Sequence, residues 1–173
     1  MVDVVDVMRA VAVMADWRLV RTFRCEAVVV ADGQERHYEL HAEPNHSSYV
    51  CKDLSTGRIS AYVDSTHERI DSDTPVPYRS SDLLWHPLPT RLAFPFTLPI
   101  WGRKHDGYRM MDADESAEAL IVRLAGQRHS SSGTLTVDLT RGLATRFEVP
   151  ELVLEYRDLE PAPNRLRDGG IEI

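Results

Sequence analysis

The segment FRCEAVVVADGQERHYELHAEP, residues 23–44, determines the fold class of this chain. In its first half, apolar side chains occupy every second position: Phe23, Cys25, Ala27 and Val29. In its second half, the same alternation returns on one face: Tyr38, Leu40 and Ala42. Asp32-Gly33 separates the two halves with a pair of residues typical of a tight β-turn. The segment therefore predicts a β-hairpin with one apolar face.

Similar alternating segments follow this hairpin along most of the chain. They predict strands at residues 49–52, 59–64, 67–71, 108–111, 119–124, 133–139, 143–149 and 152–159. Turn residues separate them, as in Ser55-Thr56-Gly57 and in DLTRG at residues 138–142. Strands joined by such short turns pair antiparallel. We therefore predict a mainly β protein, built on a strongly curved antiparallel sheet that forms an incomplete β-barrel.

The N-terminal segment has a different period. Apolar residues recur there at spacings of three and four: Val4, Val7, Met8, Val11 and Met14. This spacing predicts a one-faced helix over residues 2–15. The segment also starts with acidic residues and is interrupted by Arg9, whereas a signal peptide has a basic start and an unbroken apolar core. We therefore expect a cytoplasmic protein.

Residues 72–102 form a proline-rich insert between the two groups of strands. They contain six of the ten prolines: Pro75, Pro77, Pro87, Pro89, Pro95 and Pro99. So many prolines do not fit a sheet interior or a long helix. Short helices are expected over Leu83–Trp85 and over Arg91–Phe94. The insert is also apolar, so we predict that it packs onto the sheet as a helical or irregular lid or plug.

The composition limits the classes of function. The chain has 173 residues, of which 43% are hydrophobic and 27% charged, as in a soluble globular domain. Twenty basic against 27 acidic residues give a net charge of -7, which argues against a nucleic-acid-binding protein. No apolar run reaches the roughly 20 residues of a transmembrane helix. We expect one domain over residues 1–161 and a polar, frayed C-terminal tail over residues 162–173.

The two cysteines, Cys25 and Cys51, both lie in predicted strands. Their spacing matches neither a redox motif nor a zinc-binding motif. A disulfide between them is geometrically possible, but two buried free thiols are the favoured interpretation in a reducing compartment. We expect no metal ion and no other cofactor.

Three polar clusters suggest metal binding or catalysis, and each has a simpler interpretation. His37, Glu39 and His41 share one face of a predicted strand, but the two histidines would lie about 13 Å apart, too far for one ion. We expect a solvated face there. QRHSSSG, residues 127–133, lacks the motif around a catalytic serine and predicts a loop. MDADESAE, residues 111–118, lacks the spacing of a calcium loop and predicts a solvated loop.

The order of helix, strands, apolar insert and further strands resembles the bacterial lipoprotein-carrier family (LolA-like), including the lipid-binding lipoproteins of actinobacteria. The resemblance lies in the hairpin at residues 23–44, in KDLSTGRISAYVDSTHERI at 52–70 and in GTLTVDLTRGLATRFEV at 133–149. In that family a curved, incomplete barrel wraps around helices and leaves an apolar cavity for acyl chains. The resemblance extends to about Pro161 and implies such a cavity here. The chain has no lipobox cysteine, so the resemblance does not extend to carriage of lipoproteins.

The insert carries the candidate binding site. Its aromatic residues either complete the core or line an apolar pocket, and nearby histidines and arginines would supply polar groups at the pocket mouth. The candidate ligand-binding residues are Trp85, His86, Arg91, Phe94, Phe96, Trp101, Arg103 and His105. Arg91 or Arg103 would pair with a carboxylate head group.

The leading hypothesis is non-catalytic binding of an apolar or amphipathic small molecule, such as a lipid or a hydrophobic metabolite, in the concave face of the sheet. One alternative is a cytoplasmic enzyme of cyclase or isomerase type, with His86 or His105 as acid and base. Another is a scaffold whose sheet edge or insert docks a second protein. Binding predicts an apolar cavity, catalysis a hydrogen-bonded titratable group within it, and docking an exposed apolar patch.

Overall fold

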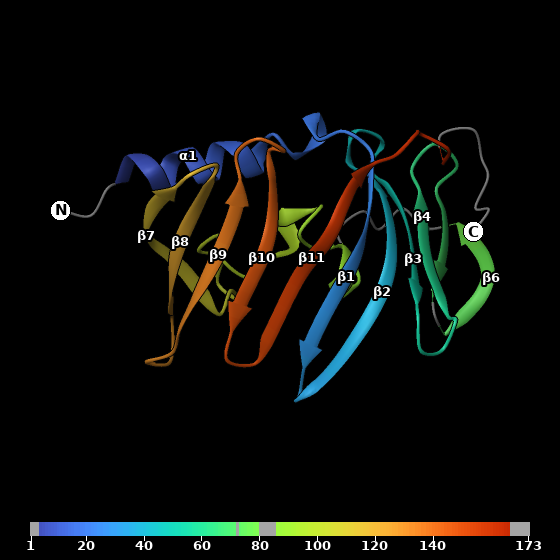
Figure 1. The fold of residues 1–173 in the computed structure, drawn as a ribbon. Helices are drawn as coiled ribbons and strands as arrows, with labels where there is room; N and C mark the ends of the chain where they lie inside the picture. Colours follow the sequence, from blue (N-terminus) through green and yellow to red (C-terminus); the bar gives the residue numbers. More distant parts are fainter. Residues whose placement is uncertain (1–3, 72, 80–85, 167–173) are drawn as a thin grey trace.

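A computed structural model describes residues 4–71, 73–79 and 86–166 of the chain (Figure 1). In these residues eleven strands form one antiparallel sheet, in the order β6-β5-β4-β3-β2-β1-β11-β10-β9-β8-β7. The strands are β1 (Phe23–Ala31), β2 (Gln34–Glu43), β3 (Ser48–Asp53), β4 (Ile59–Val63), β5 (Glu68–Asp71), β6 (Thr74–Arg79), β7 (Tyr108–Ser116), β8 (Ala119–Gly126), β9 (Ser132–Asp138), β10 (Leu143–Val149) and β11 (Leu152–Pro161). The sheet is curved and open, with β6 and β7 at its edges. The predicted mainly β fold is confirmed.

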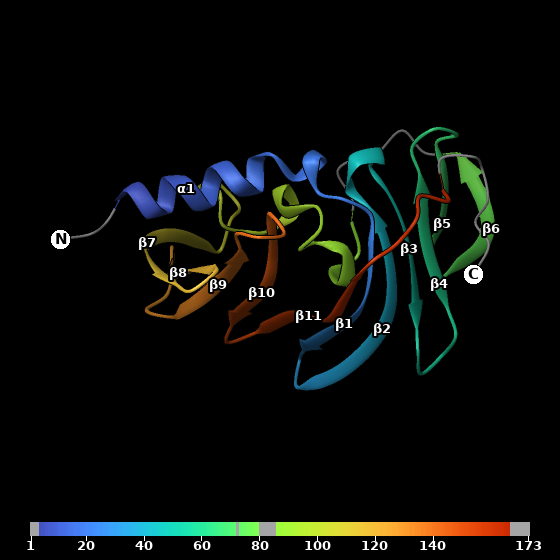
Figure 2. The same cartoon turned by 45° about the horizontal axis from the view of Figure 1, so that its top comes forward.

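The hairpin of β1 and β2 lies at the centre of this sheet. Its turn is Asp32-Gly33, where both residues have positive φ angles, 52° and 73°. The other side of β1 pairs with β11, the last strand. The meander of β1 to β6 and the meander of β7 to β11 are therefore joined along β1 and β11. Residues 86–107, which precede β7, cross the concave side of the sheet (Figure 2).

Helix α1 (Val4–Ala15) packs across β7 to β10 (Figure 2). Ala10 and Met14 are buried, and Val7 packs against the same core. Met8, predicted on the buried face, is 61% exposed, so the predicted face is wrong at that residue. The helix is apolar on more than one side, and its sequence alone therefore does not define which side faces the sheet. Among the described residues, no helix is long and apolar enough to span a membrane.

The first part of the proline-rich insert is more regular than predicted. Residues 74–79 form β6, which contains Pro75 and Pro77 and pairs with β5. An edge strand tolerates proline because the missing N–H is not needed on the unpaired side. The predicted helix over Leu83–Trp85 lies outside the described residues.

The second part of the insert is a plug in the core. It contains two 3-10 helices, η3 (Leu88–Thr90) and η4 (Pro95–Thr97), in place of the helix predicted over residues 91–94. Two further 3-10 helices, η1 (Trp17–Leu19) and η2 (Pro44–His46), flank the central hairpin. The buried side chains of the plug belong to the main hydrophobic core: Leu92, Ala93, Phe94, Leu98 and Ile100. The sheet therefore curves around this plug, and its concave side is largely filled.

The acidic segment at residues 111–118 is not a loop. β7 extends through it to Ser116, and Ala113 is buried between Asp112 and Asp114. Both aspartates pair with Arg123 on the neighbouring β8. The sequence predicted the strand only over residues 108–111, because the acidic residues that follow on its outer face weaken the apolar alternation. The loop predicted over residues 127–133 is present over residues 127–131, and β9 begins at Ser132.

The cysteines are free and buried, as predicted. Cys25 on β1 and Cys51 on β3 are both paired in register with Leu40, on the strand between them. Two strand spacings separate their Cα atoms by about 9–10 Å, whereas a disulfide allows at most about 7 Å. The predicted free thiols therefore follow from the strand order.

Both thiols are expected to react slowly with an alkylating reagent. Burial raises the pKa of Cys25 and of Cys51, and nearby acidic groups raise it further. The reactive thiolate is therefore scarce at neutral pH. Mass spectrometry after a short treatment with iodoacetamide should show unmodified native protein and doubly modified protein in denaturant. Rapid double modification of the native protein would contradict this expectation.

Candidate ligand-binding site

A pocket of about 550 Å³ opens on the concave side, between η1 and η4. We call it the apolar pocket. Its lining comes from the end of α1, η1, β4 and the insert: Ala15, Trp17, Arg18, Ser47, Tyr62, Asp64, His86, Phe94, Phe96 and Thr97. It unites three of the eight candidate residues, His86, Phe94 and Phe96. These three come from the insert, and the strands and η1 supply the opposite wall.

Aromatic rings build the wall of the apolar pocket. Phe94 is 2% exposed, and its ring packs edge-on against Trp17 with the centroids 5.3 Å apart. The ring of His86 lies flat against Phe94, with a centroid distance of 4.4 Å and an interplanar angle of 6°. Phe96 differs, because 48% of it is exposed while its ring leans on Trp101 at 5.3 Å. Phe94 therefore forms the floor, and Phe96 presents an apolar ring at the rim.

A small number of polar groups accompany these rings. The Tyr62 hydroxyl donates a 3.0 Å hydrogen bond to Asp64 Oδ1. Burial and then this carboxylate raise the pKa of Tyr62 to about 12, so the hydroxyl stays protonated at neutral pH. The guanidinium of Arg18 lies 5.2 Å from the centroid of the Trp17 ring. An apolar hollow with few polar groups is the usual composition of a small-molecule site.

A second hollow of about 410 Å³ adjoins His86. We call it the arginine pocket, because three arginines are in its lining: Arg36, Tyr38, Cys51, Asp53, Thr56, Arg58, Ser60, Asp73, His86, Pro87, Leu88, Pro89 and Arg91. His86 lines both pockets. Arg91 donates from Nε to the carbonyl oxygen of His86 over 3.1 Å. The two pockets therefore meet at one residue of the insert.

The other candidate residues lie elsewhere. Arg103 donates from its guanidinium to the carbonyl oxygens of Phe96 and Leu98, at 2.8 and 2.7 Å, and pairs with Asp106 at 3.0 Å. Trp101 donates from Nε1 to the carbonyl oxygen of Pro95 over 2.8 Å. Both residues fasten the end of the insert. His105 is exposed and is not part of either pocket lining. Trp85 lies outside the described residues.

Sequence reasoning missed Trp17 and Tyr62. Trp17 follows Met14 by three residues and so continues the apolar spacing of the helix. Tyr62 is in register with Tyr49 on β3, which places both side chains on the concave face. The helical spacing and the strand alternation therefore contained both signals, but both residues lie outside the insert that supplied the candidate residues.

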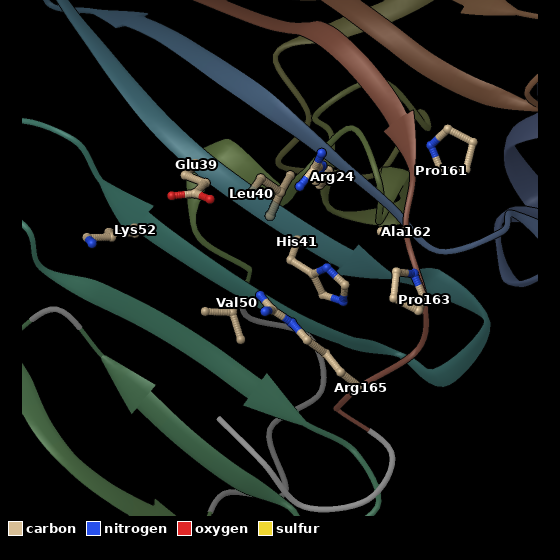
Figure 3. Close-up of a pocket in the computed structure, with 10 residues that line it drawn as sticks. All are labelled: Arg24, Glu39, Leu40, His41, Val50, Lys52, Pro161, Ala162, Pro163 and Arg165. Carbon is tan, nitrogen blue, oxygen red and sulfur yellow. The ribbon is translucent and has the colours of Figure 1, made fainter. Parts of the chain in front are cut away.

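A third pocket lies on the outer face of the sheet (Figure 3). It has a volume of about 500 Å³ and lies between β2, β3 and residues 161–166, which we call the strap. Its lining is Arg24, Glu39, Leu40, His41, Val50, Lys52, Pro161, Ala162, Pro163 and Arg165. We call this hollow the strap pocket.

The strap contradicts two expectations. Leu166 is 0% exposed and packs with Val50, Ala61 and Val63, so the chain does not fray directly after residue 161. His41 is buried under the strap, and the predicted solvated face is wrong there. A segment distant in sequence covers these positions, and local alternation cannot predict such a cover.

Glu43 holds the strap in place. Its Oε1 accepts hydrogen bonds from the backbone N–H of Arg165 at 2.6 Å and of Leu166 at 3.0 Å, and it lies 3.0 Å from His41 Nε2. Burial opposes ionisation of Glu43, but the two N–H donors and His41 outweigh it and lower the pKa of the carboxyl. Burial lowers the pKa of His41, and Arg165 lowers it further. Glu43 is therefore ionised and His41 neutral at pH 7.

In the part of the chain that the structure describes, no group of three or more His, Cys, Asp and Glu residues is placed to hold a metal ion.

Comparison with known proteins gives a likeness of fold. No family model and no curated protein matches the chain. Among solved structures, MucB matches with a TM-score of 0.58 and 12% identity, over 96% of this chain and 62% of MucB. The complex of Pseudomonas aeruginosa MucA and MucB matches with a TM-score of 0.59 and 14% identity, over 94% of this chain and 59% of that chain.

These matches support the predicted LolA-like fold. The chain spans about three fifths of the length of the MucB chains that it matches. An identity of 12 to 14% shows the architecture and not the function. The narrower resemblance to actinobacterial lipoproteins stays a prediction.

Proposed function

We propose that this chain is a non-catalytic binding protein for an apolar or amphipathic small molecule, and that the apolar pocket holds the apolar part of the ligand. The observation that carries the proposal is the lining of that pocket. A nearly buried Phe94 and a half-exposed Phe96 face a hollow of about 550 Å³ beside Trp17. An aromatic ring held half in water gains free energy when a ligand covers it. The pocket volume suits a small molecule or a short acyl chain.

The geometry supports binding more than catalysis. A histidine acid or base needs a place in the pocket and a polar partner that orients it. His105 is exposed outside both pockets, and the ring of His86 lies flat against Phe94 as part of the wall. His86 therefore serves the packing of the pocket in this arrangement.

Binding of a protein partner is the second candidate function. Two of the similar solved structures are complexes of MucB with MucA. The sheet of this chain also ends in the edge strand β7, and an edge strand offers unpaired backbone groups to a partner segment. A protein partner at β7 would leave the apolar pocket free for small molecules, so the experiment below separates the two functions.

The replacement Phe96→Ala is expected to weaken binding of N-phenyl-1-naphthylamine, a neutral apolar fluorescent probe, by more than about tenfold, or about 1.4 kcal/mol. Phe96 is half-exposed, so the free energy of unfolding should fall by less than about 1 kcal/mol. Probe fluorescence measures the affinity, and urea unfolding measures the stability.

Leu54→Ala is the matched control. Leu54 is 53% exposed, close to the exposure of Phe96, but it lies in the turn between β3 and β4 and outside the apolar pocket. Its replacement should leave probe binding unchanged. The proposed function is wrong if the wild-type protein binds no apolar probe, or if Phe96→Ala and Leu54→Ala bind the probe equally well.

A further inference from the structure

The charged groups of the arginine pocket differ in whether they have partners. Arg58 pairs with Asp73 at 3.4 Å, and Arg36 donates to Gln34 Oε1 at 3.4 Å. Asp53 Oδ1 accepts hydrogen bonds from the N–H and hydroxyl of Ser55 and from the N–H of Thr56. These groups therefore meet an opposite charge or a hydrogen-bond partner within the protein.

Arg91 differs from Arg36 and Arg58, which are exposed to water, because it is partly buried. Among the residues that the structure describes, no carboxylate forms an ion pair with it, and its Nε donates to the carbonyl oxygen of His86. The N–H groups of its two Nη atoms form no hydrogen bond with the described residues and remain as donors in the pocket lining. Burial lowers the pKa of its guanidinium. An arginine keeps its charge at neutral pH even so.

A partly buried cation without a counter-ion is unfavourable, because water no longer solvates it fully and no carboxylate replaces the water. Arg103 shows the contrast. Its guanidinium forms an ion pair with Asp106 and donates hydrogen bonds to two carbonyl oxygens, so few of its N–H groups remain to bind a ligand. Of the two arginines that the sequence offered as partners for a head group, Arg91 is the one whose Nη atoms form no hydrogen bond or ion pair with the described residues.

We infer that Arg91 receives the acidic head group of an amphipathic ligand, while the apolar part of the same ligand lies in the apolar pocket beyond His86. The inference rests on the proposed function and narrows the ligand class to apolar acids. A carboxylate matches the guanidinium fork with two parallel hydrogen bonds. Tyr38, also in the lining, has a pKa raised chiefly by burial and keeps a hydroxyl donor beside this head group. The volume of about 410 Å³ admits a head group of this size.

The test compares dodecanoate with 1-dodecanol as competitors of N-phenyl-1-naphthylamine. Wild-type protein should bind dodecanoate at least about tenfold more tightly than dodecanol, which is the effect of one charge-assisted pair. Arg91→Gln should remove this preference by weakening dodecanoate alone. Arg91→Lys should restore part of it, because lysine keeps the charge and loses the fork. Dodecyl phosphate serves as a third competitor. Comparing its affinity with that of dodecanoate shows whether the site prefers a phosphate or a carboxylate head group.

Arg58→Gln is the control in the same pocket. Arg58 already pairs with Asp73 and is exposed, so its replacement should leave the preference for dodecanoate intact. Equal competition by dodecanoate and dodecanol, unchanged in Arg91→Gln, would overturn the inference while the proposed function stands. Failure of the reporter and of both competitors to bind would overturn both. A preference for acid that Arg58→Gln abolishes and Arg91→Gln does not would also refute the role of Arg91.

Discussion

Tyr156→Ala is expected to lower the free energy of unfolding by about 3–5 kcal/mol, as the removal of other large buried aromatic rings does. Tyr156 on β11 is buried, and its ring packs against Phe23 with the centroids 5.8 Å apart. Its hydroxyl donates to the carbonyl oxygen of Pro89 over 2.9 Å and accepts the N–H of Ala93 over 3.1 Å. One side chain therefore fixes the plug to the centre of the sheet. Urea unfolding followed by circular dichroism measures the loss.

Tyr156→Phe separates the hydroxyl from the ring. It keeps the packing but removes the donor to the buried carbonyl oxygen of Pro89, which costs about 1–3 kcal/mol. The N–H of Ala93 keeps a second acceptor, the carbonyl oxygen of Thr90 at 3.0 Å. Because Phe94 follows Ala93 directly, this variant should also weaken binding of the apolar probe. A Tyr156→Phe protein as stable as wild type would show that the two hydrogen bonds do not hold the plug.

The sheet could be predicted because its signals are local. The alternation of apolar residues and the Asp32-Gly33 turn define the central hairpin within about 20 residues, and the turn at residues 138–142 defines another. Antiparallel neighbours follow from short turns. The pairing of β1 with β11 joins segments more than 100 residues apart, and the sequence analysis did not predict it.

Other features depend on contacts that no local pattern contains. β6 exists because an edge position tolerates Pro75 and Pro77. β7 extends through acidic residues because Arg123 on β8 compensates Asp112 and Asp114. His41 is buried because the strap returns across β2 and β3. In each case the deciding partner lies on another strand or segment.

The candidate site was predictable in part for the same reason. The aromatic residues of the insert had to leave water, and the structure places Phe94 and Phe96 in one pocket. Sequence could not decide between Arg91 and Arg103, because the choice depends on which carbonyl oxygens and carboxylates each guanidinium reaches. Arg103 binds Asp106 and carbonyl oxygens of the insert, whereas Arg91 forms no ion pair with the described residues.

Glu43→Ala is expected to lower the free energy of unfolding by about 2–4 kcal/mol at pH 7. The replacement removes the acceptor of two backbone N–H groups, from Arg165 and Leu166, and each lost acceptor costs about 1–3 kcal/mol where the donor stays buried. Hydrogen exchange at the Leu166 amide should quicken before the rest of the sheet opens, because the strap loses its anchor. Glu39→Ala is the control: Glu39 is exposed on the same strand and lines the same strap pocket, so its effect should stay within about 0.5 kcal/mol.

The pH dependence gives the sharper test of this anchor. The pKa of Glu43 is lowered in the folded protein, so its ionised form stabilises the fold above the unfolded value of about 4.3, and that stability is lost as the pH falls through the folded pKa. The pKa of His41 is lowered too, so protonation favours the unfolded chain once the pH falls below about 6.5. Protonated glutamate resembles glutamine, and the stability difference between wild type and Glu43→Gln should therefore be largest near pH 7 and shrink below pH ~4. A difference that stays constant from pH 7 to pH ~3 would mean that Glu43 does not hold the strap as a carboxylate.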